Sequence, residues 1–163
     1  MRVKGIVDED FINYKLPSMH ISCYSCSFKC DKECGKQVCQ NSALANSPDI
    51  EISVEKLVKR YLGNNITKAV VFAGLEPFDD IKNVLAFIME LRLKNNNRDD
   101  VVIYTGYTES EIHTLFADCF AQLQNLGNII IKFGRFIPNQ NLHYDETLGV
   151  FLASNNQYAK RIS

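Results

Sequence analysis

Lys68-Ala-Val-Val-Phe-Ala73 is a continuous apolar run that is too short for a helix and rich in β-branched residues. Such a run is typical of a strand buried on both faces of a sheet. Residues 100–104 and 128–133 have the same character. Helical patterns separate the three runs, one from residue 79 or 80 to the polar break at 95–97, and one from a capping box at Thr108 to about residue 126. This alternation predicts βα units on a mainly parallel sheet, in an α/β fold.

The remaining elements and the length of the chain are consistent with one domain. The expected strands cover 1–7, 18–22 and 149–153, and a helix is expected between a cap at Ser53 and an end at Gly63. A chain of 163 residues can bury a hydrophobic core large enough to be stable without disulfide bonds. We therefore expect a single domain over 1–163, with a cysteine loop at 23–39.

Charge and hydropathy exclude several classes of partner. The net charge is −1, from 18 basic and 19 acidic residues dispersed along the chain, so no basic field for nucleic acid is expected. No apolar stretch approaches the roughly eighteen residues of a membrane span. Residues 1–15 contain no apolar run of signal-peptide length. We expect a cytoplasmic protein that binds neither a membrane nor nucleic acid.

Five of the six cysteines fall within seventeen residues, which requires a chemical explanation. They are Cys23, Cys26, Cys30, Cys34 and Cys39. Disulfides are disfavoured in a reducing cytoplasm, where clustered thiols more often bind metals. The first two and the last two cysteines can be paired as a closed zinc site. Three cysteines can instead hold a [4Fe–4S] cluster and leave its fourth iron open to a ligand.

The spacing and context of three cysteines carry a family resemblance. Cys26-Ser-Phe-Lys-Cys30, followed by Cys39-Gln-Asn-Ser-Ala-Leu, resembles the cluster loop of radical S-adenosylmethionine (radical SAM) enzymes. In particular, the loop resembles that of the activating protein of anaerobic ribonucleotide reductase. The usual pattern has two residues between the second and third cysteines, whereas eight lie between Cys30 and Cys39 and three between Cys30 and Cys34. We favour Cys26, Cys30 and Cys39 as ligands, with Cys34 or Cys23 as alternatives.

Four later segments follow the same family's order, and each comes after an expected strand. Gly74-Leu-Glu-Pro77 resembles a Gly-Gly-Glu-Pro segment that contacts the amino group of the SAM methionine moiety, with leucine in place of the second glycine. Three further segments resemble the Trp/Tyr-Thr/Ser-Gly-Tyr, Asp-Gly-Arg/Pro-Phe and Ser-Ser-Asn-Gln segments of the same activating proteins. They are Tyr104-Thr-Gly-Tyr107, Gly134-Arg-Phe136 and Ser154-Asn-Asn-Gln157, in that order. The plain alternative for each is a turn after a strand. The predicted cofactor-binding residues are Gly74, Leu75, Glu76, Pro77, Tyr104, Thr105 and Gly106.

The resemblance implies a shortened partial (β/α) barrel of radical SAM type with a mainly parallel sheet. It implies an iron–sulfur oxidoreductase that cleaves SAM to a 5′-deoxyadenosyl radical, with no catalytic residue beyond the cluster ligands. That radical would generate a glycyl radical on a partner, anaerobic ribonucleoside-triphosphate reductase, with flavodoxin or ferredoxin as electron donor. One alternative is a radical SAM enzyme with another peptide or small-molecule substrate. The other is a non-enzymatic zinc-binding interaction protein.

Overall fold

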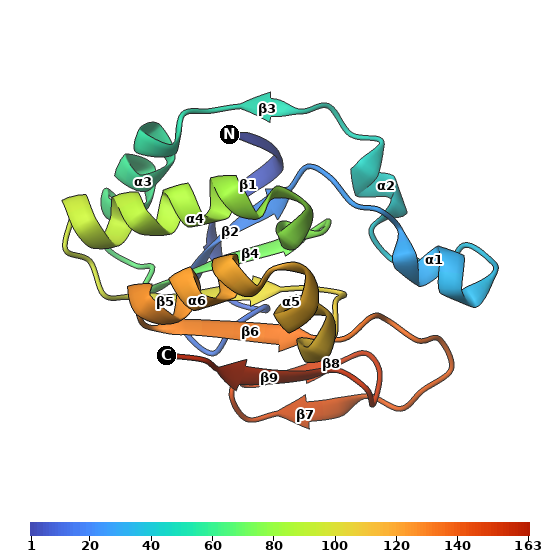
Figure 1. Cartoon of the computed structure of the whole chain (residues 1–163). Helices are drawn as coiled ribbons and strands as arrows, with labels where there is room; N and C mark the ends of the chain where they lie inside the picture. The colour runs from blue at the N-terminus through green and yellow to red at the C-terminus, as the bar shows by residue number, and fades with distance from the viewer.

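A seven-stranded sheet organises the chain in the computed structural model, which describes all residues from 1 to 163 (Figure 1). The strand order is β3-β1-β2-β4-β5-β6-β9, and β7 and β8 form a separate hairpin. The strands are β1 (Arg2–Asp10), β2 (Ser18–Cys23), β3 (Ile50–Glu51), β4 (Ala69–Gly74), β5 (Asp100–Tyr104), β6 (Ile129–Phe133), β7 (His143–Asp145), β8 (Val150–Leu152) and β9 (Tyr158–Arg161).

The four central strands are parallel neighbours, because β2 pairs with β4, β4 with β5, and β5 with β6. The three apolar runs of the sequence are β4, β5 and β6, and nearly all of their residues are buried. Parallel strands end at the same edge of a sheet, so the segments that follow β2, β4, β5 and β6 lie near one another.

The predicted shortened partial barrel with a mainly parallel sheet is wrong. At one side of the sheet β1 pairs antiparallel with both β2 and β3, and at the other side β9 pairs antiparallel with β6. With the β7–β8 hairpin, four of the seven strand pairings are antiparallel. No helix lies in the connection 11–17 or in the connection from β6 to β9, so neither forms a βαβ crossover. The protein is a mixed α/β protein with an open sheet.

Helices cover one face of the sheet, as Figure 1 shows. The helices are α1 (Lys29–Cys34), α2 (Ser42–Ala45), α3 (Val54–Leu62), the 3₁₀ turn η1 (Pro77–Asp80), α4 (Ile81–Met89) with its π-helical end η2 (Glu90–Lys94), α5 (Glu109–Leu115) and α6 (Ala117–Leu126). Apolar residues of α3, α4 and α6 pack against one face of β4, β5 and β6 and form the main core. A smaller core on the opposite face lies under the hairpin and the β1–β2 connection.

The predicted helix caps are confirmed. The Ser53 side chain accepts a hydrogen bond from the backbone N–H of Lys56, and Thr108 with Glu111 forms the capping box. The helix expected from Thr108 to about residue 126 is divided at Phe116 into α5 and α6. No helix of the structure combines the length and apolarity needed to cross a membrane.

Candidate functional site

A cavity of about 550 Å³ lies at the carboxyl edge of the central strands. Three of the clustered cysteines line it, namely Cys26, Cys30 and Cys39, whereas Cys23 and Cys34 do not. Of the predicted cofactor-binding residues, all but Pro77 line the same cavity. The sequence motifs that follow β2, β4 and β5 are therefore brought together at one place.

The thiols face one cavity without forming a preassembled metal-binding group. All six cysteines of the chain are free. Three thiols around one cavity are a donor set that suits an iron–sulfur cluster with three protein ligands, because thiolates are soft ligands for iron. The residues present therefore fit such a cluster, and the assignment of these three as its ligands stays a prediction.

Burial disfavours ionisation of two of the cavity thiols, those of Cys26 and Cys30. It raises the pKa of Cys26 to about 11, against a backbone hydrogen bond from Phe28 that lowers this pKa. The Phe28 N–H lies 3.3 Å from the Cys26 sulfur, and Phe28 adopts a left-handed conformation with φ 53°. Burial also raises the pKa of Cys30, and the nearby Cys39 adds to that effect. A metal that binds here must displace protons, so its affinity should increase with pH.

Hydrogen bonds hold the start of the cysteine loop against the segment after β4. The backbone N–H of Glu76 donates to the Ser25 carbonyl at 2.8 Å, and the backbone N–H of Ser27 donates to Asp79 at 2.8 Å. The hydroxyl of Tyr107 donates to the other oxygen of Asp79 at 2.9 Å. Asp79 thus joins the cysteine loop to the segment after β5, although sequence reasoning had assigned it only a helix start.

Gly74 is required by the geometry at the end of β4. Its φ is +80°, and an added Cβ would meet a methyl carbon of Leu44 at 2.8 Å and the Cβ of Ser22 at 3.1 Å. The Gly74 carbonyl accepts a hydrogen bond of 2.6 Å from the side chain of Asn41, which follows Cys39 in the chain. Leu75, where the related segment has glycine, is buried and has no positive φ. Glycine is therefore not needed at that position.

Glu76 connects two of the predicted segments. Its carboxylate accepts hydrogen bonds from the Thr105 hydroxyl at 2.7 Å, the Gly106 N–H at 2.8 Å and the Phe78 N–H at 3.0 Å. Burial, the largest influence, raises the pKa of Glu76 from 4.5 to about 7, while these three bonds lower it. The bond to Phe78 caps the η1 turn, so Glu76 also has a structural role at the start of this helical segment, where a carboxylate is favoured.

The segments after β6 and before β9 complete the rim. The Gly134 N–H donates to the Tyr107 carbonyl at 3.0 Å. Gln157, which lines the cavity, donates to the Gly134 carbonyl at 3.2 Å, and Asn156 donates to the Arg135 carbonyl at 2.8 Å. All four segments that follow the family's order therefore lie at the same edge.

Lys132 is a cavity residue that sequence reasoning missed. Its side chain is 6% exposed, and its ammonium group donates to the Gly134 carbonyl at 2.7 Å. Burial lowers the pKa of Lys132 to about 8. No carboxylate forms an ion pair with it. The signal in the sequence was a lone charge inside the otherwise apolar run of β6.

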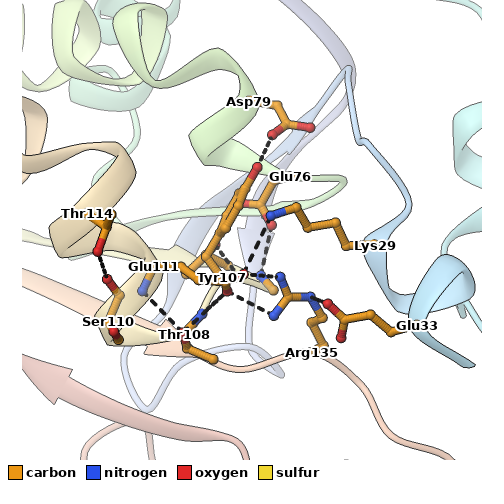
Figure 2. A network of polar contacts seen from close by, with 12 residues as sticks. Lys29, Glu33, Glu76, Asp79, Tyr107, Thr108, Ser110, Glu111, Thr114 and Arg135 are labelled. Atoms are coloured by element: carbon orange, nitrogen blue, oxygen red, sulfur yellow. Dashed lines mark hydrogen bonds and ion pairs between the residues drawn. The ribbon is translucent and has the colours of Figure 1, made fainter.

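Arg135 is the centre of a polar network beside the cavity, shown in Figure 2. Its guanidinium group makes a bidentate pair with Glu111 at 2.6 and 2.9 Å, and its Nε lies 3.2 Å from Glu33 of α1. Lys29 of α1 lies 3.5 Å from Glu111 and packs over the Tyr107 ring, with 4.4 Å from its Nζ to the ring centroid. The network therefore fixes α1 against α5 and the segment after β6.

Comparison with known proteins identifies the family. A family described as "4Fe-4S single cluster domain" matches residues 19–158, a range that contains the cysteine loop and the cavity residues. No curated protein and no solved structure is significantly similar to the chain. The match spans most of the 163 residues, and an iron–sulfur cluster domain agrees with three thiols at one cavity. The chain belongs to the 4Fe-4S single cluster domain family.

Proposed function

We propose that this protein is a radical SAM enzyme that generates a glycyl radical on a partner, anaerobic ribonucleoside-triphosphate reductase. The observation that carries the proposal is one cavity lined both by three thiols and by the two segments predicted to bind the cofactor. Those segments are residues 74–76 and 104–106. Membership of an iron–sulfur cluster family supports the cluster, and the SAM chemistry and the partner are our inference.

In this proposal Cys26, Cys30 and Cys39 hold a [4Fe–4S] cluster, and SAM occupies the rest of the cavity. The bound cluster would supply the electron that cleaves the sulfonium of SAM, and the 5′-deoxyadenosyl radical so released would abstract hydrogen from the partner's glycine. Flavodoxin or ferredoxin would deliver the electron.

The chain itself would bind and orient the cofactor. A backbone carbonyl of the segment at residues 74–76 would accept from the amino group of SAM. Lys132 supports a ligand that carries a carboxylate in this cavity, because a buried ammonium without a carboxylate partner is costly and the ligand's carboxylate would neutralise it. Glu76 would act indirectly, since its carboxylate already holds Thr105 and Gly106 in place.

The test is SAM cleavage by the anaerobically purified protein. After reconstitution with iron and sulfide, addition of dithionite and SAM should yield 5′-deoxyadenosine. Cys26→Ala should abolish both the cluster and the product. Cys119→Ala is the matched control, because Cys119 lies on α6 and does not line the cavity. Tight zinc at about one per chain, with neither cluster nor SAM cleavage, would support the zinc-binding alternative instead.

The partner requires a separate measurement. Incubation of the loaded protein and SAM with anaerobic ribonucleotide reductase should give a glycyl radical signal in electron paramagnetic resonance. SAM cleavage without that signal, for every glycyl radical enzyme of the host, would favour another peptide or small-molecule substrate.

A further inference from the structure

The eight residues between Cys30 and Cys39 have a defined fold. Helix α1 spans Lys29–Cys34 and ends at Gly35, which adopts a left-handed conformation with φ 64° and turns the chain back. The ion pairs of Lys29 and Glu33 described above hold the helix against α5 and Arg135. The return segment therefore starts from a fixed position and leads toward the cavity.

Asp31 joins the two ends of the segment between Cys30 and Cys39. One oxygen of its carboxylate accepts the backbone N–H of Val38 at 2.7 Å and the backbone N–H of Cys39 at 2.8 Å. Hydrogen bonds to an ionised acceptor are about twice as strong as neutral ones. Asp31 follows Cys30 directly, so these bonds fold the chain back until Cys39 lies beside the residue after Cys30.

A second contact holds the other side of Cys39. Asn41, two residues further on, donates to the Gly74 carbonyl at the end of β4. Cys39 is thus held between Asp31 on one side and the edge of the sheet on the other, and it lines the cavity. Cys34, at the end of α1, has no such tether and does not line the cavity.

We infer that Asp31 is the positioning residue that places Cys39 at the cavity as the third cluster ligand. This explains how the loop accommodates eight residues between Cys30 and Cys39, where the related cluster loops have two. The inference rests on the proposed assignment of Cys26, Cys30 and Cys39 to the cluster. It adds that a carboxylate eight residues earlier in the same loop orients the backbone of Cys39.

The experiment compares cluster loading in variants of the full chain. After anaerobic reconstitution, iron per chain and the visible absorption of the cluster are followed during challenge with a chelator. Asp31→Ala should lower iron retention about tenfold, as expected for loss of a group that orients a metal ligand. Asp31→Asn keeps an oxygen that accepts from both N–H groups and should stay within about threefold of the wild type.

Three variants serve as references. Cys39→Ser should lose the cluster, whereas Cys34→Ser should retain it. Lys36→Ala changes an exposed residue of the same segment between Cys30 and Cys39 and should retain iron as the wild type does. Wild-type iron retention in Asp31→Ala, or loss of the cluster in Cys34→Ser but not in Cys39→Ser, would overturn the inference.

A measurement on the unmodified chain covers the case in which Asp31→Ala does not fold. The cluster-loaded wild type is treated with iodoacetamide under anaerobic conditions and analysed by mass spectrometry. Protection of Cys39 together with alkylation of Cys34 supports the inference, and the reverse pattern refutes it. Neither experiment depends on SAM cleavage, so a loaded protein that fails to cleave SAM would refute the proposed function alone.

Discussion

Replacement of Glu76 by glutamine should change how stability depends on pH. The folded-state pKa of Glu76, about 7, lies above its ordinary value of 4.5, because burial penalises the carboxylate. The native protein therefore binds this proton more tightly than the unfolded chain does. The resulting stability is fully present below pH 4.5 and is lost as the pH rises through 7. At 1.36 kcal/mol per pKa unit, the loss is about 3 kcal/mol.

Glutamine cannot titrate, but it also cannot satisfy all three donors. Its single oxygen can replace the carboxylate oxygen that faces Thr105 and Phe78, which leaves its amide group opposed to the N–H of Gly106. An unpaired buried N–H costs about 1–3 kcal/mol at any pH. Near pH 5 the unfolding free energy of Glu76→Gln should therefore be lower than that of the wild type. Near pH 8 it should equal or exceed the wild-type value.

The assay is urea unfolding of the metal-free wild type and variant at a series of pH values. Groups far from residue 76 titrate equally in the two proteins and cancel. The difference in unfolding free energy therefore reports on Glu76 together with Lys132, whose pKa the charge of Glu76 raises. That difference should move by about 2.5 kcal/mol in favour of glutamine between about pH 5 and pH 8, since the remainder of the effect falls below pH 5. A difference that does not vary with pH would show that Glu76 is ionised throughout, and would refute the argument from burial.

Three further substitutions test the geometry of the cavity. Gly74→Ala should lower the unfolding free energy by about 2 kcal/mol or more, measured in urea, because of its positive φ and a leucine methyl carbon 2.8 Å from the new Cβ; wild-type stability would contradict the steric argument. Lys132→Met should stabilise the metal-free protein by about 2 kcal/mol at pH 7, because burial lowers the pKa of this lysine from 10.5 to about 8 and the substitution removes only one hydrogen bond. A lower unfolding free energy for the variant would show that the ammonium is well accommodated. Tyr107→Phe should cost about 1 kcal/mol through the lost hydrogen bond to Asp79, and an unchanged thermal unfolding midpoint would argue against that bond.

Local patterns were sufficient for most of the elements near the site. The apolar runs predicted β4, β5 and β6 because a strand buried on both faces needs apolar residues at successive positions. Ser53 and Thr108 predicted two helix starts because a side-chain oxygen at that position satisfies a free backbone N–H. The sequence also placed each of the four related segments directly after an expected strand, and the structure brings those that follow β4 and β5 to one cavity.

Other features depend on contacts between residues far apart in the chain. The direction of β1 and β9 relative to the central strands is set by connections that contain no crossover helix, and short apolar segments do not encode it. Helix α1 was missed because six residues with two cysteines have no amphipathic period, and ion pairs to Arg135 and Glu111 hold it in place. The sequence favoured Cys39 over Cys34 as the third ligand but kept Cys34 as an alternative, and only the folded loop shows that Cys39 lines the cavity and Cys34 does not.

The sequence by itself determined the kind of chemistry available. Five clustered thiols and four turns after strands can be recognised from the residue types and their order along the chain, without the fold. Only the tertiary structure decided which groups share a cavity. Cys39 reaches it through two backbone hydrogen bonds to Asp31, and Lys132 reaches it because alternate residues of a strand face opposite sides of a sheet. Burial then shifts the pKa values of Glu76 and Lys132, an effect that arises only when distant segments exclude water together.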